Sequence, residues 1–296
     1  MMHQSKRCAA WHVSLFVCIL FAGSAIGGTP KQIISGTLEA QLQDRSDIIY
    51  YTDFENEDWH YGWKASDEGD NTKNFRLVDM GTKGAVKAFK GKALEVTIQA
   101  RDHYGIDTKF DFKDHLGAYP KEMYSRYYCC YADDFPGYHG KAPGWSGTEQ
   151  AGWGGKVSDG TNGWSARGTI KAVGKDKLRM MYYTYHGDMR GKWGDEYRWA
   201  GPGGKMETNR WYCIEQYCKI NTPGKKDGVL TAWVDGVLVL EKTDVKMRSV
   251  DTLHLKAFWL NYYYGGGGVS KKARHVYIDN LALSTEKRIG AYSPAH

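Results

Sequence analysis

The sequence predicts an all-β fold, an antiparallel β-sandwich or jelly roll in which one face forms a concave groove. Many short segments alternate apolar and polar residues with a period of two, which is the pattern of half-buried strands. Helical periodicity is nearly missing, and the 36 glycines fall among turn signals at short spacing. These observations favour many short antiparallel strands over a helical or mixed architecture.

The elements can be assigned in chain order. Residues 31–44 hold the only hint of helical periodicity, ahead of the first strand. The clearest strand candidates are residues 94–99, 124–131, 178–183, 211–220, 229–234, 253–261 and 275–283. Asp235 and Gly236 stand between two apolar runs, which is a strong hairpin signal. The sequence shows no internal repeat and no low-complexity linker, so we predict a single domain over residues 29–296.

Strand alternation also assigns side chains to faces. If Tyr182 fills the core together with the apolar residues that share its parity, then Tyr183 and Tyr185 lie on the opposite face. Ser165 and Arg167 share a face for the same reason. Several strands therefore offer polar and aromatic groups on the face away from the core.

Residues 1–28 have the order of a secretory signal peptide. Lys6 and Arg7 precede an apolar stretch over residues 13–26, and small residues follow it. That stretch is shorter than the roughly 20 residues that a membrane span needs. We expect a secreted or periplasmic protein with no membrane segment after cleavage. Removing two basic residues and no acidic one lowers the formal net charge from +6 to +4, which is too little to argue for nucleic-acid binding.

Four cysteines remain after export, namely Cys129, Cys130, Cys213 and Cys218. Disulfides are compatible with an oxidising compartment. The adjacent pair would point to opposite faces of a strand, so at most one of the two easily reaches any given neighbour. The CxxC spacing of zinc sites is absent, and the pairing stays open.

The segment richest in chemistry is the glycine-rich run over residues 139–168, together with the tyrosine-rich strand that follows it. It concentrates fixed cations and tryptophans in a short stretch of chain. Aromatic rings stack on pyranose faces, and Arg or Lys engages carboxylates. The composition of this segment therefore suits a long anionic sugar polymer.

A polymer of uronic acids can be cut by β-elimination. The C5 proton is weakly acidic, so the neighbouring carboxylate must first be neutralised by a cation or a hydrogen-bond donor. A base then removes the proton, and an acid protonates the leaving glycosidic oxygen. Tyrosine can do either if a nearby cation lowers its pKa. The candidates for these tasks are Lys141, Arg167, Tyr183, Tyr185 and His103, with no metal or nucleotide.

Several sequence blocks then carry a family resemblance. GKAPG at residues 140–144, GGK at 154–156 and WSARG at 164–168 resemble the GKLPG…GG…SAR pattern of the family 14 polysaccharide lyases. YTY at residues 183–185 resembles the YxY strand of that family, and residues 96–105, 259–268 and 277–280 also fit it. The likeness covers roughly residues 90–285. Its departures are Ala142 in place of leucine and a longer spacing from Arg167 to the tyrosine pair.

The resemblance implies a β-jelly roll with a cleft that cleaves a β-1,4-linked polyuronate, alginate or glucuronan, by elimination. Lys141 and Arg167 would neutralise the uronate carboxylate with support from Ser165, and Tyr183 or Tyr185 would be the acid or base. His103 is an additional candidate base or neutraliser. The other residues that we predict to bind substrate are Gln99, Gln150, Lys156 and Trp145.

No cofactor is required for this chemistry. A structural calcium ion would fit where the termini of a jelly roll adjoin, with Glu55 and Asp279 as carboxylate ligands. We expect an acidic polysaccharide as the partner, and a monomeric chain. One other reading is a non-catalytic carbohydrate-binding module or lectin, which the 11 tryptophans would suit. A sandwich glycoside hydrolase is the third, although the ExDxxE strand pattern is absent.

Overall fold

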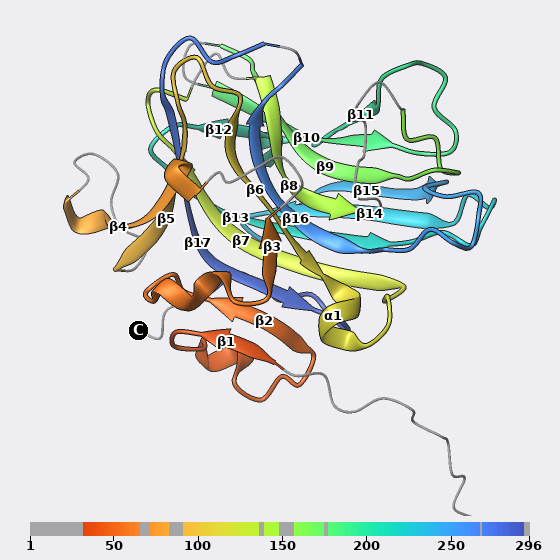
Figure 1. The fold of residues 1–296 in the computed structure, drawn as a ribbon, viewed down its shortest axis with the longest axis horizontal. Coiled ribbons are helices and arrows are strands. Elements are labelled where there is room, and N and C mark those ends of the chain that lie inside the picture. The colour runs from red at the N-terminus through yellow and green to blue at the C-terminus, as the bar shows by residue number, and fades with distance from the viewer. Residues whose placement is uncertain are drawn as a thin grey trace, which may run out of the picture.

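The computed structural model describes residues 32–65, 72–82, 91–135, 139–147, 157–174, 177–266 and 268–292. Two β-sheets hold most of the regular secondary structure in this part of the chain (Figure 1). All strand pairings are antiparallel except the short pairing of β1 with β2. The predicted antiparallel sandwich is confirmed.

One sheet has nine strands. Its strands, in order across the sheet, are β1 (Ile33–Ser35), β2 (Ile48–Thr52), β17 (Arg274–Ser284), β7 (Glu122–Tyr131), β13 (Trp211–Lys219), β14 (Gly228–Val234) and β15 (Val237–Val245), with β5 (Lys92–Ile98) and β4 (Phe75–Asp79) branching from β17. The turn between β14 and β15 has positive φ at Asp235 and Gly236, as the hairpin signal predicts.

The other sheet has eight strands and carries the candidate site. Its strands, in order, are β11 (Asp195–Arg198), β10 (Lys177–Tyr185), β9 (Ser165–Ala172), β8 (His139–Ser146), β16 (Ala257–Tyr264), β6 (Tyr104–Asp111) and β3 (Trp63–Ala65), and β12 (Lys205–Glu207) also pairs with β10. Strands β8, β9, β10 and β11 thus lie side by side in one sheet.

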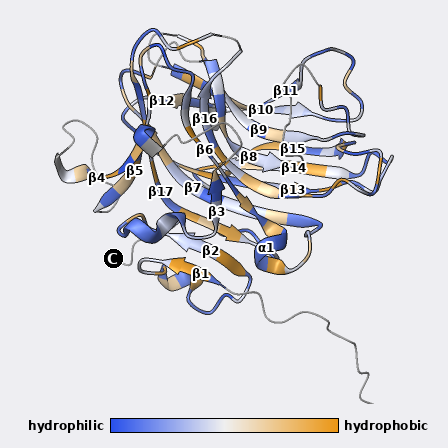
Figure 2. Cartoon of the chain, in the orientation of Figure 1, coloured by the Kyte–Doolittle hydropathy of each residue, from blue (hydrophilic) through white to orange (hydrophobic). Residues whose placement is uncertain are grey.

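One apolar core fills the space between the sheets. Leu178, Met180 and Tyr182 are fully buried in it, as the alternation predicts. The Tyr182 hydroxyl donates a hydrogen bond across the core to the carbonyl oxygen of Thr231 on β14. Figure 2 shows apolar and polar residues alternating along many strands. The core therefore fixes which residues of β9 and β10 face outward, and these include the predicted site residues.

Two local predictions differ from the structure. Residues 31–44 were expected to show helical character, but their described part holds β1 and a single 3₁₀ turn at Ala40–Leu42. The strand predicted over residues 253–261 begins at Ala257 and runs to Tyr264.

The α-helix α1 (Phe112–Leu116) is too short to give a periodic pattern. The Asp111 side chain caps it by accepting a hydrogen bond from the Lys113 N–H, and Gly117 ends it in the left-handed region.

The four cysteines Cys129, Cys130, Cys213 and Cys218 are buried and free. Cys129 lies in the core between the sheets, whereas Cys130 packs in a separate cluster on the outer side of the nine-stranded sheet. This is the opposite-face placement that adjacent strand positions require. No described helix is long and apolar enough to cross a membrane.

Candidate functional site

The outer face of the eight-stranded sheet brings the predicted cations and tyrosines together. Strand register places Tyr183 of β10 opposite Arg167 of β9, and Arg167 opposite Gly144 of β8. Gly144 in turn pairs with Trp259 of β16. These four residues therefore form one row across β10, β9, β8 and β16. In this row Gly144, which has no side chain, lies between the Arg167 guanidinium and the Trp259 indole.

A β-bulge at Pro143 decides which residues of β8 belong to this face. The register of β8 against β9 shifts between Ala142 and Gly144, and proline has no N–H to donate to the ladder. Because of the extra residue, Ala142 and Trp145 both point into the core although they are three positions apart. The buried side chain of Gln216 on β13 donates a hydrogen bond to the Pro143 carbonyl oxygen (3.1 Å). The opposite sheet thus anchors the bulge.

The bulge also corrects one predicted substrate contact. Trp145 was expected to stack on sugar, but its side chain is 0% exposed and packs against Phe258 in the core. Plain alternation from Lys141 would place Trp145 on the same face as that lysine. The inserted residue reverses its direction, so Trp145 is a core residue.

Gly144 is needed where the backbone of β8 passes close to Arg167 on β9. A Cβ at Gly144 would lie 2.4 Å from the carbonyl oxygen of Ala166 and 2.7 Å from the Cα of Arg167, distances that only a glycine allows. The Arg167 guanidinium carbon lies 4.5 Å from the Trp259 ring centroid and 5.5 Å from that of Tyr263. The aromatic rings therefore hold the guanidinium over a position without a side chain.

Arg167 is a buried cation without an acidic partner among the described residues. It is 5% exposed, and its Nη1 donates a long hydrogen bond to Oδ1 of Asn261 (3.4 Å). Its Nε also has no hydrogen-bond partner in the described part of the chain. A buried charge is costly unless it is paired, so this arrangement favours an anionic ligand.

Lys141 lies beside Tyr183 on the same face. It is 7% exposed, and its Nζ lies 3.3 Å from the centroid of the Tyr183 ring. Burial lowers the pKa of this amine well below its ordinary value of 10.5, and the charge of Arg167 lowers it further. The ammonium form of Lys141 is therefore less stable than that of an exposed lysine.

The pKa of Tyr183 moves in the opposite direction. Burial raises it above its ordinary value, and contact with Tyr185 adds to the rise. The sequence-based argument expected a nearby cation to lower a tyrosine pKa, and the structure shows the reverse for Tyr183. Its hydroxyl oxygen accepts a hydrogen bond from the Gly194 N–H (3.0 Å). The phenol form is favoured, and the phenol is an acid.

Tyr185 and Ser165 extend the site along their strands. The two tyrosine rings make an edge contact with centroids 5.4 Å apart, and Tyr185 pairs in register with Ser165. Ser165 is fully buried, and its hydroxyl has no hydrogen-bond partner among the described residues. Both residues lie on the face that alternation predicts.

His103 lies in the turn before β6, at the far end of this face. Its ring is 5.0 Å from that of Tyr263, the residue that also contacts Arg167, and its Nδ1 is 2.7 Å from the Gly268 carbonyl oxygen. Gln99 is exposed in the turn between β5 and β6, off the strands that carry Lys141 and Arg167. Gln150 and Lys156 lie outside the described residues.

The proposed calcium ligands have other contacts. Glu55 accepts a hydrogen bond from the Lys92 N–H, and Asp279, buried on β17, accepts one from the Asn280 N–H. Strands β2 and β17 do adjoin, but the described residues contain no group of three or more His, Cys, Asp or Glu side chains that could hold a metal ion. The calcium ion stays a prediction.

Sequence reasoning missed several members of the site. Trp259, Asn261 and Tyr263 share the outer face of β16, and the alternation within residues 257–264 could have indicated this. Gly194 could not have been found, because its role depends on the return of the chain from β10 to β11. Its N–H meets the Tyr183 hydroxyl through a tertiary contact that no local pattern records.

The fold and this site define a β-sandwich protein whose sheet face presents buried cations and tyrosines. The family model "Polysaccharide lyase 14" matches residues 90–280. The chain therefore belongs to the polysaccharide lyase 14 family, and it is a polysaccharide lyase. No curated protein matches the sequence.

Solved structures of similar fold include three alginate lyases. A mutant of alginate lyase Aly36B in complex with alginate tetrasaccharide is 23% identical with a TM-score of 0.57, covering 66% of this chain and 82% of that one. The PL-14 alginate lyase from Aplysia kurodai is 17% identical with a TM-score of 0.58, covering 73% and 88%. Alginate lyase vAL-1 from Chlorella virus is 19% identical with a TM-score of 0.54, covering 73% and 94%. At these identities the likeness establishes the shared fold.

The lowered pKa of Lys141 predicts a stability gain when this amine is removed. The unfolded chain binds a proton at Lys141 that the folded chain resists, so the penalty is present at neutral pH and disappears as the pH rises towards 10.5. We expect Lys141→Met to raise the free energy of unfolding by about 1–2 kcal/mol at pH 7, with a smaller gain at pH values near 10. Denaturant unfolding at both pH values measures this.

The exposed Lys225, on the turn before β14, supplies the matched control. Lys225→Met should change the free energy of unfolding little at either pH. A Lys141→Met protein that is less stable than the wild type, or whose gain is the same at both pH values, would contradict the lowered pKa of Lys141.

Proposed function

We propose that this polysaccharide lyase cleaves a β-1,4-linked polyuronate, alginate or glucuronan, by β-elimination at the site around Lys141, Arg167 and Tyr183. The observation that carries the proposal is Arg167, a buried cation without an acidic partner among the described residues, next to an amine and a phenol with oppositely shifted pKa values. The alginate oligosaccharide bound to a protein of similar fold supports a uronate polymer as the substrate.

Arg167 would neutralise the carboxylate at C6 of the uronate. A guanidinium presents two parallel N–H donors to a carboxylate, and the Trp259 ring holds it in place. Withdrawing charge from the carboxylate makes the C5 proton easier to remove, because the carbanion-like transition state is then stabilised at that carboxylate. Asn261, whose Nδ2 has no partner in the described residues, would donate a further hydrogen bond.

Lys141 would be the base. Its neutral amine takes the C5 proton, the C5–H electron pair forms the C4–C5 double bond, and the bond from C4 to the glycosidic oxygen breaks. This revises the role of carboxylate neutraliser that the family resemblance implies for Lys141. A fixed cation would suit neutralisation, whereas an amine with a lowered pKa suits proton abstraction.

Tyr183 would be the acid that protonates the leaving glycosidic oxygen. The resulting phenolate is stabilised by the hydrogen bond from the Gly194 N–H and by the new Lys141 ammonium against its ring. Proton return from Lys141 to Tyr183 then restores both groups, so one turnover leaves the enzyme unchanged. Tyr185 packs against the Tyr183 ring and is the alternative acid.

We further propose that residues 1–28 direct export and that the mature chain acts outside the cell or in the periplasm as a monomer. All of the proton transfers above use side chains of this chain, and the calcium ion suggested for Glu55 and Asp279 has no part in them. The expected substrate is an anionic polymer, in keeping with a site that is built around Arg167.

The test is a panel of polyuronates incubated with the purified protein. We expect an increase in ultraviolet absorbance from the unsaturated product with alginate or glucuronan, and none with a neutral β-1,4-glucan. Tight polymer binding without new chain ends over a long incubation would instead establish the lectin alternative.

A further inference from the structure

The connection between β10 and β11 is held firmly at both ends. At its start, the Gly187 N–H donates to the Lys246 carbonyl oxygen (2.7 Å), and the Asp188 carboxylate forms ion pairs with Lys226 and Lys246. At its end, the Gly194 N–H donates to the Tyr183 hydroxyl. The ends of this connection are therefore fixed relative to the proposed acid.

His186 ties the two ends to each other. It is buried, its Nδ1 accepts a hydrogen bond from the Asp188 N–H (3.2 Å), and its Nε2 lies 2.8 Å from the Asp195 carboxylate. The Tyr197 hydroxyl is 3.1 Å from the same Nε2. One imidazole thus bridges the residues that flank the connection, which limits the freedom of the segment between them.

The middle of this connection, residues 190–193, projects into solvent. We call these four residues the arm; it holds Arg190, Lys192 and Trp193, all of them exposed. Trp193 is 66% exposed, and the Lys192 ammonium lies 5.5 Å from its ring centroid. Neither Arg190 nor Lys192 forms an ion pair with a described residue. The arm therefore presents one large aromatic ring with two positive charges.

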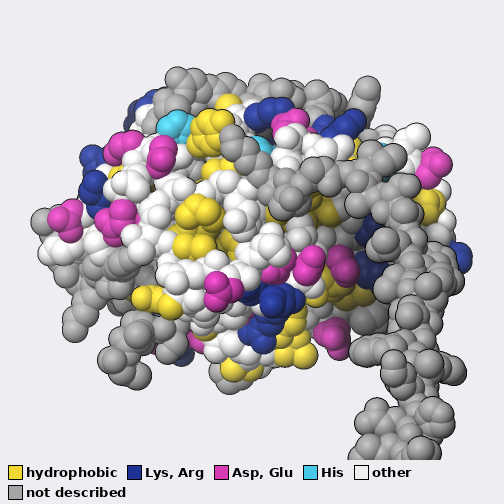
Figure 3. Space-filling model, turned by 90° about the horizontal axis from the view of Figure 1, so that it is seen from below, with side chains coloured by type: hydrophobic (Ala, Val, Ile, Leu, Met, Phe, Trp, Pro, Cys, Tyr) yellow, Lys and Arg dark blue, Asp and Glu magenta, His cyan; other side chains and the backbone are white. Residues whose placement is uncertain are grey.

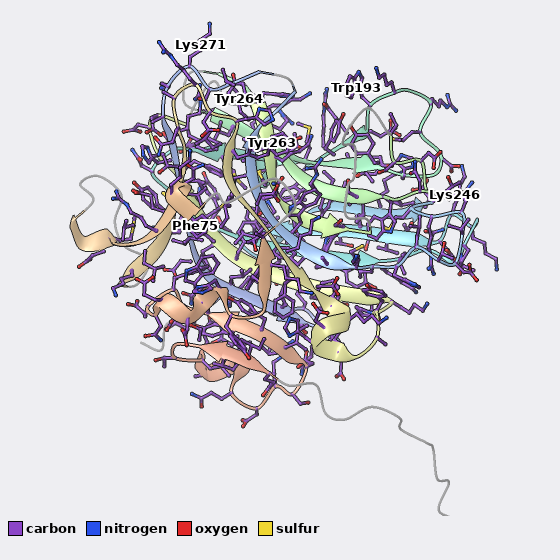
Figure 4. All side chains as sticks on the ribbon, in the orientation of Figure 1. Phe75, Trp193, Lys246, Tyr263, Tyr264 and Lys271 are labelled. Atoms are coloured by element: carbon purple, nitrogen blue, oxygen red, sulfur yellow. The ribbon has the colours of Figure 1, made fainter. Side chains whose placement is uncertain are left out.

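The arm carries basic side chains and no acidic one, unlike other parts of the surface. On the face seen in Figure 3, acidic and basic side chains are interspersed. Leaving an indole in water forfeits the burial of a large apolar surface, so an exposed Trp on an anchored segment is informative. Figure 4 shows Trp193 on the connection leading to β11, across the sheet from Tyr263 on β16.

The arm lies next to the reacting groups. Trp193 directly precedes Gly194, whose N–H contacts the Tyr183 hydroxyl, and neighbouring Cα atoms are about 3.8 Å apart. A substrate with its glycosidic oxygen at Tyr183 would extend past this segment.

We propose that the arm binds the uronate unit on the leaving-group side of the cleaved bond, with the Trp193 indole stacked on the pyranose and Lys192 or Arg190 on its carboxylate. This assignment rests on the proposed elimination at Tyr183. The ring recognises the sugar face, and the cations select a charged sugar over a neutral one.

The test compares Trp193→Ala, Trp193→Phe and the wild type on the polyuronate that the wild type cleaves. We expect Trp193→Ala to raise KM about tenfold with kcat changed less than threefold, because tryptophan is among the residues whose truncation costs the most binding free energy. Trp193→Phe should recover much of the loss. Lys192→Gln should raise KM at low salt and have less effect at high salt.

Val237→Ala, at a similarly exposed apolar position on the β14–β15 hairpin, is the control and should leave KM unchanged. If the wild type cleaves and Trp193→Ala has an unchanged KM, or loses kcat alone, the arm does not bind substrate, while the elimination site stands. If the wild type cleaves no polyuronate, the proposed function itself fails.

Discussion

Lys141→Arg should lower kcat by about a thousandfold, although arginine supplies a fixed positive charge at this position. The guanidinium of arginine does not lose its proton at accessible pH, so it cannot serve as a base. A residue that only neutralised the substrate carboxylate would tolerate this change far better. The substitution therefore separates the two roles that a lysine can take at this position.

Two further observations sharpen this test. The wild-type kcat/KM should rise with pH through the lowered pKa of Lys141, since the neutral amine is the active form. Lys141→Ala should lose this dependence and regain part of its activity on addition of a small primary amine, which can occupy the space of the lost side chain. If Lys141→Arg shows near wild-type turnover, the assignment of Lys141 as the base is wrong.

Tyr183→Phe should lower kcat by about 10²–10⁴-fold with little change in KM. The phenol proton is removed from the site, whereas the ring that contacts Lys141 and Tyr185 remains. Tyr185→Phe is the matched control, because it deletes one hydroxyl from the neighbouring ring. Tyr185→Phe should lower kcat much less than Tyr183→Phe does. The measurement is kcat and KM for each variant on the same polyuronate.

The pH profile adds a second readout for Tyr183. Its pKa is raised by burial, so the loss of wild-type activity at high pH should lie above the ordinary range for a tyrosine. This alkaline limb should be missing from the residual activity of Tyr183→Phe. If Tyr185→Phe is the more damaged enzyme, the two tyrosines exchange roles and the hydrogen bond from Gly194 loses its proposed purpose.

The fold and the outward residues could be predicted because they depend on local alternation. Tyr182 and Tyr183 have neighbouring positions on one strand, and a period of two is enough to send one to the core and the other to the outer face. The hairpin at Asp235 and Gly236 follows from local turn chemistry in the same way. A shift of one residue in the register of either strand would turn its core side chains towards solvent, so burial of one sheet face disfavours it.

The bulge at Pro143 and the pKa shifts in the site could not be predicted, because they depend on contacts between segments that are distant in the sequence. The bulge at Pro143 reverses the direction of Trp145, and it is anchored by Gln216 from the other sheet. The pKa directions of Lys141 and Tyr183 follow from burial, which a sequence pattern does not measure. A tyrosine next to a lysine suggested a lowered tyrosine pKa, but burial raises the pKa of Tyr183 instead.

The most direct test of elimination at this site is mass spectrometry of the products from alginate and glucuronan, with ultraviolet absorbance recorded on the same samples. β-Elimination predicts new non-reducing ends that absorb in the ultraviolet and oligosaccharides lighter by one water than hydrolysis products of the same length. Oligosaccharides with the mass of hydrolysis products and no absorbance would contradict the account.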